Sequence, residues 1–507
     1  MGRVCCSSES GACEGNGGMM RMKLREKTES FLNFQKKEES SEGNRLKTEK
    51  GHPAVERYLS EVGGQMRSSR IKQSTLDELE GHIHEQAEEY IREGEEEASA
   101  YERAVKEMGD PVDVGISFDR IHRPHLEWRF LLIIAGVSLF SLFLEYILQE
   151  AVDAHDVYFP DYCVHLLSGL AAMFFVYRID YSFIRGKSIY FAVGFFTFFL
   201  LMLLMNGRNI NGAEYFASLH FGTYHGILAV SHFFPLYLPV FAGVLYDLRG
   251  RKAWKAVSGI FVFSVFPVIY TYGVGDNAMT VVLLLSEITL MVTAVRLGWY
   301  TLSKKNVLLA AGGVLTGGLL MFVTLGRSLT SGYHLMRLQS WLDALSGRDN
   351  VYNMASERIR DIFGDSVWIG KSDTASQGVM MIPANMQEYV LANISANCGK
   401  LAVILVLGIF VFLGSYIFRI SVMQKNQLGK MMGISCGVVL LAEAFVNSGM
   451  VFRLFPFASG HLPFLSHGGT GMIVSYALLG IVLSIFRYKD ILGPENTVVK
   501  EPFQPSA

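Results

Sequence analysis

The sequence predicts an all-α, polytopic membrane protein of about ten transmembrane helices with a small soluble helical domain in front of them. Half of its 507 residues are hydrophobic, and 35 of them are phenylalanine. From Trp128 onward the apolar residues gather in runs of about 20, the length that a helix needs to cross a bilayer. The formal net charge of −2 gives no sign of a nucleic-acid partner.

The N-terminal residues 1–50 are rich in Lys, Glu, Ser and Gly and hold few apolar side chains, which predicts a disordered cytoplasmic tail. Met19, Met20 and Met22 leave the true start methionine open. The six cysteines of the chain show neither metal-ligand nor disulfide spacing. No cleavable signal peptide is expected.

Residues 53–122 predict a small cytoplasmic helical domain, because apolar side chains recur there at helical spacing. We expect one helix to begin at Ser74-Thr75 and to end at Gly94, and the next to end at Gly109. Asp110 then caps a further helix that starts with Pro111. No catalytic constellation is present, so we expect a docking or regulatory role.

His82 and His84 of this domain stand two residues apart, so they point in different directions from a helix. We therefore expect a solvated helix face and no metal site. The motifs Val55-x-x-Tyr-Leu, Glu78-Leu79-x-x-His82 and Met108-Gly-Asp-Pro111 resemble the permease-prefix, or HAAS-type, helical domains that precede membrane regions in some bacterial proteins.

The membrane region covers residues 128–490, and a cytoplasmic tail, 491–507, follows it. The apolar runs predict spans near 128–148, 160–177, 188–206, 232–248, 254–273, 277–295, 307–326, 390–418, 431–450 and 469–486. Lys and Arg follow every second span, which places those loops and both chain ends in the cytoplasm. The long loop 327–389 and the loop 451–468 are then outside.

The stretch 447–471 lies between two predicted spans and contains Pro456, Pro463 and several glycines, so it cannot be helical throughout. At membrane depth an irregular backbone persists only inside protein or beside a water-filled cavity. A plain inter-helix hairpin is the alternative.

The order of residues in this stretch resembles the last outer loop of the FtsW/RodA/SpoVE (SEDS) family of peptidoglycan polymerases. One ungapped register keeps the matching positions Asn447, Gly449, Met450, Val451, Pro456, Leu462, Pro463, Phe464, Ser466, Gly468 and Gly469. Arg453, Ser459, His467 and Thr470-Gly471 depart from the pattern. The resemblance implies that this loop shapes a substrate cavity, with Asn447, Pro456, Pro463, Ser466, Gly468 and Gly469 at the substrate.

The resemblance also extends to the long outer loop. With Pro383 and Gly399 as anchors, Glu388 falls on the family's essential Asp, while Met386, Gln387 and Ala396-Asn397 replace its neighbours. A glycan polymerase needs one carboxylate to deprotonate the acceptor hydroxyl, so the resemblance implies that Glu388 is the catalytic base. A solvated acid at a helix start is the alternative.

The pyrophosphate that leaves in such a reaction requires positive charge, from arginines or from a divalent cation. Arg337 and Arg453 are the candidates, and interfacial anchoring is their alternative.

Glu443 and Asp276 are candidate intramembrane polar residues. A hydrogen-bonded packing role is equally open for Glu443. Asp276 stands where the family shows Pro-Asp-x-Gly-Thr, and the family's Gln-Pro-Ser-Glu element before the fourth span is missing.

The resemblance implies an inverting peptidoglycan glycosyltransferase of the bacterial plasma membrane that polymerises lipid II at the outer face, in cell division, cell shape or sporulation. It also implies a class B penicillin-binding transpeptidase as partner. A catalytically silent scaffold of a cell-wall complex is the first alternative, which the altered neighbours of Glu388 favour. A lipid-linked precursor transporter is the second, but the sequence shows no convincing internal repeats.

Overall fold

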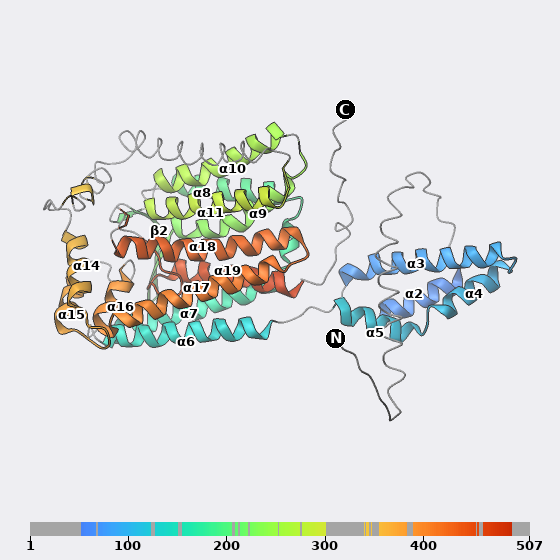
Figure 1. The fold of residues 1–507 in the computed structure, drawn as a ribbon, viewed down its shortest axis with the longest axis horizontal. Coiled ribbons are helices and arrows are strands. Elements are labelled where there is room, and N and C mark those ends of the chain that lie inside the picture. Colours follow the sequence, from blue (N-terminus) through green and yellow to red (C-terminus); the bar gives the residue numbers. More distant parts are fainter. Residues whose placement is uncertain are drawn as a thin grey trace, which may run out of the picture. The chain divides into compact units, whose positions relative to one another are not determined.

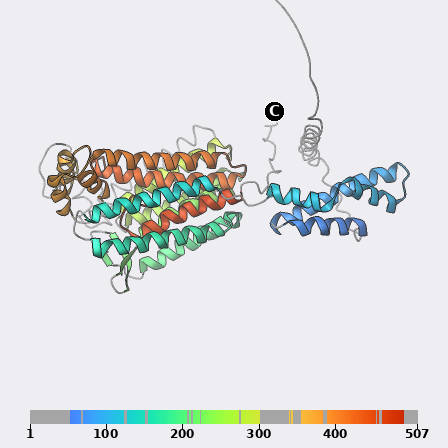
Figure 2. The same cartoon turned by 90° about the horizontal axis from the view of Figure 1, so that it is seen from below.

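The computed structural model describes residues 52–66, 69–122, 127–150, 155–204, 208–210, 213–221, 224–251, 253–273, 276–300, 339, 341–343, 346, 354–382, 389–452, 454–455 and 460–488. These residues form two compact units, divided near residue 123. Figure 1 shows the first unit in blue and the second in cyan to red, and Figure 2 shows both from below. Each unit is considered by itself.

The described part of the first unit holds four helices, α2 (Pro53–Gln65), α3 (Ser69–Arg92), α4 (Glu97–Glu107) and α5 (Pro111–His122). Apolar side chains of α2, α3 and α4 form its core: Val55, Tyr58, Val62, Leu79, Ile83, Ala87, Ala100 and Ala104. The helix ends at Gly94 and Gly109 are confirmed, and both glycines have a positive φ. Asp110 accepts hydrogen bonds from the amides of Val112 and Asp113, as the capping prediction requires.

The predicted helix start at Ser74-Thr75 is wrong, because α3 already begins at Ser69. Lys72 and Gln73 are good helix formers, so nothing in the local sequence stops the helix from extending backwards. The Gln73 side chain donates to Asp77 one turn later at 2.8 Å, which supports the added turn. Thr75 is buried inside the helix rather than placed at its cap.

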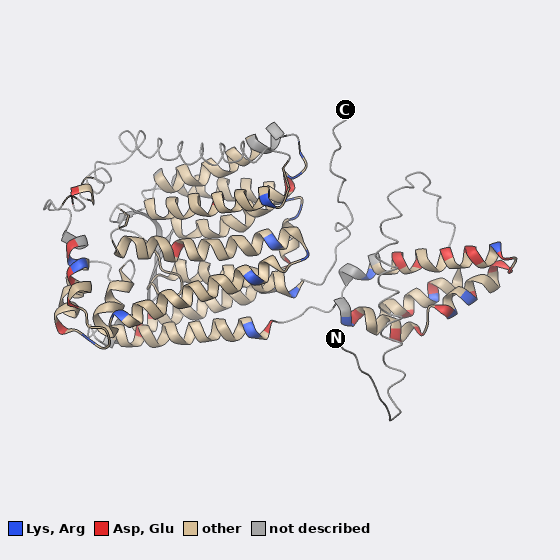
Figure 3. Cartoon of the chain, viewed as in Figure 1, with Lys and Arg blue, Asp and Glu red and all other residues tan. Residues whose placement is uncertain are grey.

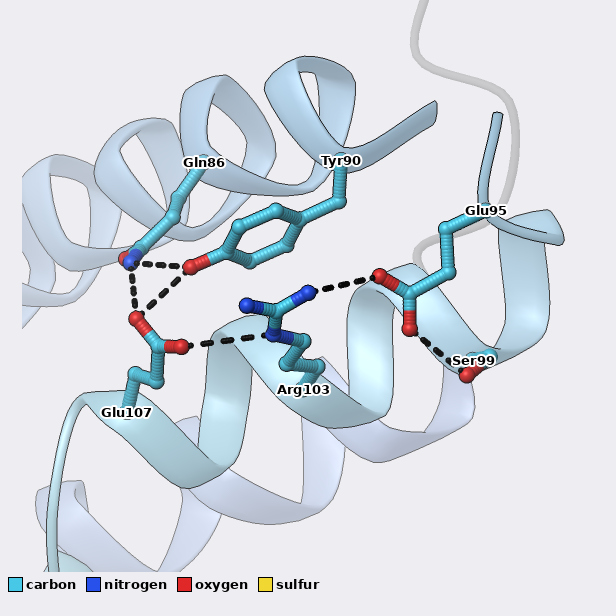
Figure 4. A network of polar contacts seen from close by, with 6 residues as sticks. All are labelled: Gln86, Tyr90, Glu95, Ser99, Arg103 and Glu107. Atoms are coloured by element: carbon cyan, nitrogen blue, oxygen red, sulfur yellow. Dashed lines mark hydrogen bonds and ion pairs between the residues drawn. The ribbon is translucent and has the colours of Figure 1, made fainter. Parts of the chain in front are cut away.

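A polar network ties α3 to α4 at the surface of this unit (Figure 4). The Arg103 guanidinium lies 4.1 Å from the centre of the Tyr90 ring and forms ion pairs with Glu95 and Glu107. Tyr90 and Gln86 both donate to Glu107 at 2.6 and 2.8 Å. The Glu107 acceptor raises the pKa of the Tyr90 hydroxyl, because the hydrogen bond favours its protonated form. The network fixes the register of the two helices.

The second unit is a bundle of long apolar helices together with several shorter ones. In chain order its elements are α6 (Trp128–Glu150), α7 (His155–Arg178), η2 (Tyr181–Ile184), α8 (Ser188–Leu204), β1 (Arg208–Ile210), β2 (Ala213–Phe221), β3 (Tyr224–Ala229), η3 (Ser231–Leu236), α9 (Tyr237–Asp247), α10 (Ala253–Gly273), α11 (Asn277–Arg296), α14 (Met354–Asp365), α15 (Asp373–Met380), α16 (Val390–Cys398), α17 (Lys400–Val422), α18 (Gln427–Val451) and α19 (Gly469–Arg487).

Six of the described helices are long and apolar enough to cross a membrane, namely α6, α7, α11, α17, α18 and α19, and shorter apolar helices cover 188–202 and 258–272. The predicted polytopic helical fold is therefore confirmed. The predicted span 307–326 lies outside the described residues. The predicted span 232–248 consists of the short η3 and the 11-residue α9.

The predicted span 390–418 is broken at Gly399, so the crossing helix is α17. Gly399 has φ 95°. A Cβ on Gly399 would lie 2.7 Å from the carbonyl oxygen of Trp368, so a glycine is needed both for the backbone turn and for the close approach. Hydropathy alone cannot place this break, because the apolar character continues on both sides of it.

A small antiparallel sheet between α8 and η3 is a feature that the sequence patterns do not predict. β2 pairs with β1 and with β3, and Phe221 lies opposite Tyr224 at the β2–β3 turn. β3 lies against α19 and α7.

Close helix contacts occur at glycines, as is usual in membrane bundles. A Cβ on Gly414 of α17 would lie 2.5 Å from Leu441 of α18. A Cβ on Gly480 of α19 would lie 2.6 Å from the carbonyl oxygen of Met173 in α7. These contacts hold α18 and α19 in the middle of the bundle, where most of their side chains are buried.

Helices α14, α15 and α16 gather at one end of the bundle (Figure 1). Most Lys and Arg residues of the membrane helices lie at the opposite end (Figure 3). There, α7, α11, α17 and α19 each finish with an arginine in the last turn. The bundle therefore has one basic end and one end covered by α14, α15 and α16.

Candidate functional site

The described residues between α18 and α19 that lie next to α19, 460–468, pack into the bundle and line the candidate site. The Asn447 side chain is fully buried and donates to the carbonyl oxygen of Gly460 at 2.6 Å, which ties α18 to the returning chain. The Leu462 amide donates to the Ser466 hydroxyl at 2.8 Å and closes a tight turn around Pro463. Ser466 and Pro463 are both buried. These sequence-predicted site residues therefore shape the loop through internal contacts.

Phe464, at the tip of this turn, is the only described non-glycine residue with a positive φ, 63°. Such a backbone costs on the order of 1–3 kcal/mol and persists where the surroundings enforce it. The Tyr162 hydroxyl donates to the Phe464 carbonyl oxygen at 2.8 Å, and the Phe464 ring packs edge-on against Tyr476. Residues of α7 and α19 therefore hold the turn in its strained form.

A small cavity lies beside this loop, and four titratable side chains line it. They are His232 of η3, Asp276 before α11, Glu443 of α18 and His461 of the loop, and we call this group the acid–histidine pocket. The cavity holds about 10 Å³, which is close to the space that one water molecule needs. The structure thus brings the two predicted intramembrane acids, Glu443 and Asp276, to one place.

The interactions of the acid–histidine pocket are incomplete among the described residues. Asp276 caps α11 by accepting from the Met279 amide at 2.9 Å, and the rings of His232 and His461 lie 5.3 Å apart. Glu443 Oε2 and His461 Nε2 are buried without a hydrogen-bond partner in the described part of the chain. A buried polar atom without a partner costs about 1–3 kcal/mol, so these two atoms are suited to an exchangeable proton, a water or a ligand group.

Burial, reinforced by the neighbouring His232, lowers the pKa of His461 to about 3. The imidazole is therefore neutral at physiological pH. A Cβ on Gly471 would lie 2.4 Å from this ring, so a glycine is needed at the first turn of α19 for the histidine to fit.

A second polar cluster fixes the other side of the loop. His467 Nδ1 lies 3.0 Å from Glu145 Oε1 of α6, and Gln149 donates to the same oxygen. The His467 ring also contacts the rings of Tyr162 and His165 on α7. Gly469 leaves room for His165, because a Cβ there would lie 2.7 Å from its ring. Gly468 has no comparably tight contact.

The predicted base Glu388 and the predicted cations Arg337 and Arg453 lie outside the described residues, as does Pro456. Among the described residues, no group of three His, Cys, Asp or Glu side chains is arranged to hold a metal ion. A divalent cation at the site stays a prediction.

Sequence reasoning missed the histidines of both clusters and Glu145. His467 was visible only as a departure from the family pattern, and His232 only as part of the stretch that replaces the Gln-Pro-Ser-Glu element. Glu145 did carry a usable signal, since an acid near the end of a predicted span is a functional candidate by default.

The fold and site define a class of protein: a multi-pass helical membrane protein with an irregular, polar loop packed inside one end of its bundle. The family model for FtsW, RodA and SpoVE, described as a cell cycle protein, matches residues 125–491. The chain belongs to this family.

Curated relatives agree with this membership. A protein named probable peptidoglycan glycosyltransferase FtsW from a Geobacter species is 22% identical over 66% of this chain and 89% of its own length. One of the same name from Alcanivorax borkumensis is 24% identical over 74% of this chain and 96% of its own. The peptidoglycan glycosyltransferase RodA of Mycobacterium tuberculosis is 24% identical over 30% of this chain and 32% of its own.

Solved structures share the fold. One chain comes from work on the structural coordination of polymerization and crosslinking by a peptidoglycan synthase complex. It matches with a TM-score of 0.57 and 19% identity, covering 72% of this chain and 99% of that chain. The Thermus thermophilus rod shape determining protein RodA matches with a TM-score of 0.50 and 15% identity, over 72% and 97% of the two chains.

Proposed function

We propose that this protein is an inverting peptidoglycan glycosyltransferase that polymerises lipid II. The observation that carries the proposal is the family match across the whole membrane unit, together with relatives named as glycosyltransferases over most of their length. The end of α18, with the buried Asn447, and the packed loop that follows it, with the buried Ser466, form the part of the chain in which the family's residue pattern is best kept.

In the proposed reaction the Glu388 carboxylate takes the proton of an acceptor sugar hydroxyl. The hydroxyl oxygen then attacks the anomeric carbon of a lipid-linked donor, and the bond from that carbon to the pyrophosphate oxygen breaks. The pyrophosphate leaves with the bonding electrons, and Arg337 and Arg453 stabilise its negative charge. Inversion follows from a single displacement at the anomeric carbon.

The basic end of the bundle supports an orientation with that end in the cytoplasm. The helices α14–α16 and the loop between α18 and α19 then face outward, where lipid II is polymerised, in the bacterial plasma membrane. Both chain ends are cytoplasmic in this arrangement. The resemblance to a chain of a peptidoglycan synthase complex supports a class B penicillin-binding transpeptidase as partner.

The test is polymerisation of lipid II by the purified full chain, alone and with its cognate transpeptidase, comparing wild type with Glu388→Gln. We expect glycan chains from the wild type and a loss of at least about 100-fold in the variant, the usual contribution of a general base. Asp373→Asn, at the first turn of α15, is the matched control on the same loop and should leave the rate unchanged.

Chains that persist in Glu388→Gln would retain the enzyme and remove this residue from the role of base. The second candidate function is a catalytically silent scaffold, which the replaced neighbours Met386 and Gln387 favour. Folded protein that makes no chains under any pairing would establish that alternative.

A further inference from the structure

The short turn between α14 and α15 carries three consecutive apolar side chains that the protein leaves uncovered. Val367 is 42% exposed, Trp368 67% and Ile369 76%. Isolated exposed apolar residues are ordinary, but a contiguous group that includes a tryptophan marks a surface that meets something apolar.

This turn is fixed to the first turn of α17 by backbone hydrogen bonds. The Lys400 amide donates to the Val367 carbonyl oxygen at 3.0 Å, and the Leu401 amide donates to the Trp368 carbonyl oxygen at 3.1 Å. The Gly370 amide donates to the Cys398 carbonyl oxygen at 3.1 Å. The first amides of a helix have no partner within it, so this turn supplies partners for the start of α17. The position of this turn along the bundle axis is therefore fixed by the membrane-spanning helix α17.

The exposed side chains continue an apolar surface that already faces lipid. Leu401, Ile404 and Leu405, in the first two turns of α17, are 51%, 56% and 55% exposed on a helix of membrane-spanning length. In a multi-pass membrane protein such a face contacts acyl chains. The turn sits at the end of this face, at the level where the span begins.

We propose that the turn Val367–Ile369 is an interfacial membrane anchor, which inserts into the lipid leaflet at the α14–α16 end of the bundle. Trp368 lies at the head-group level, where amphipathic aromatic rings gather, and Ile369 reaches the adjacent acyl region. The exposed Lys371, which follows the turn, lies within reach of lipid phosphates.

Insertion of this anchor also sets the depth of α15 and α16 relative to the membrane. The Ser372 amide donates to the Ala396 carbonyl oxygen at 2.9 Å, so the start of α15 and the end of α16 are tied to the same turn. This inference is independent of the proposed glycosyltransferase activity, because a silent scaffold would carry the same anchor and the test below measures depth alone.

The experiment uses the full chain in vesicles of phosphatidylcholine and phosphatidylglycerol whose acyl chains carry bromine at a shallow or a deep carbon. In one variant Trp128, Trp254, Trp299 and Trp341 are replaced by Phe, so Trp368 is the sole tryptophan fluorophore. We expect shallow bromine to remove most of its fluorescence, deep bromine to remove less, and aqueous iodide to remove little.

The matched control retains only Trp299, which is 6% exposed and donates to Gln427 at 2.9 Å, so lipid bromine should leave it unquenched. The single change Trp368→Phe in the otherwise native chain is a second, less disruptive variant, and it should reduce the quenching by shallow bromine to the part that the exposed Trp128 contributes. Quenching of Trp368 by iodide and not by bromine would place the turn in water and overturn the proposal. Protection from both quenchers would place it against another protein and overturn it equally.

Discussion

Tyr162 shows how one side chain can hold a strained segment of the loop. It is fully buried in α7, and its hydroxyl donates to the carbonyl oxygen of Phe464, whose backbone is left-handed. The bond therefore acts on a residue 302 positions away in the sequence.

We predict that Tyr162→Phe lowers stability by about 1 kcal/mol, the net value of a typical buried hydrogen bond, and more if the Phe464 carbonyl oxygen is left unsatisfied. Thermal unfolding of the detergent-purified protein measures this. Tyr190→Phe, at a tyrosine of α8 that is 77% exposed, is the control and should be neutral. Equal midpoints for the two variants would mean that the hydroxyl does not support the turn.

His461 makes a pH-dependent contribution to stability. Its pKa is about 3 in the folded protein against an ordinary value of 6.5, because it is buried and lies beside His232, in a pocket that Glu443 and Asp276 also line. Below pH 6.5 the unfolded chain binds a proton there that the folded chain does not. His461 therefore makes its full contribution to stability above pH 6.5. This contribution is lost as the pH falls from 6.5 toward the folded-state pKa of about 3.

We predict that wild type loses stability between about pH 7 and about pH 5 more steeply than His461→Gln, with a difference on the order of 1 kcal/mol per pH unit. Unfolding midpoints across this range, compared between the two proteins, provide the measurement. Parallel pH profiles would show that the pKa of His461 is not lowered by folding.

At the scale of elements, the bundle is held by helix pairs that approach at glycines. Gly480 of α19 lies against the backbone of Met173 in α7, whereas a Cβ on Gly408 of α17 would have no neighbouring atom within 4 Å. The same chemical change thus has opposite consequences at the two sites.

We predict that Gly480→Ala destabilises the protein by about 1–3 kcal/mol, because its Cβ forces α7 and α19 apart. Gly408→Ala should be neutral or stabilising by up to about 1 kcal/mol, because alanine favours a helix and has room there. Denaturation of both variants in the same detergent gives the comparison. A Gly480→Ala protein as stable as Gly408→Ala would contradict the close α7–α19 packing.

At the scale of the whole molecule, the distribution of charge predicts how the membrane unit is oriented. Arginines in the last turns of α7, α11, α17 and α19 mark one end, and α14–α16 mark the other. Short basic loops remain on the cytoplasmic side during insertion.

We predict that a cysteine placed at Gly364, an exposed site on α14 with open space around it, reacts with a membrane-impermeant thiol reagent in intact cells. A cysteine at the exposed Lys425, between α17 and α18, should react only after permeabilisation. Native cysteines are first replaced by serine. The reverse pattern would invert the topology and exclude polymerisation at the outer face by the residues proposed here.

Local residue patterns and the lengths of apolar runs were enough to predict several features of this protein. Gly94, Gly109 and Asp110 end and begin helices because a positive φ or a capping oxygen acts within a few residues. The spans α6, α11 and α19 follow from apolar runs long enough for a bilayer. The motif of the last outer loop identified the family, since its spacing is kept without gaps.

Which of these elements lie against one another depends on how the chain packs in three dimensions. The acid–histidine pocket joins η3, α11, α18 and the last loop, and the pair of Glu145 and His467 spans 322 positions. The break at Gly399 depends on the Trp368 carbonyl oxygen that approaches it from another segment. Such contacts arise because packing brings distant residues within a few ångströms, and a pattern along the chain carries no information about that distance.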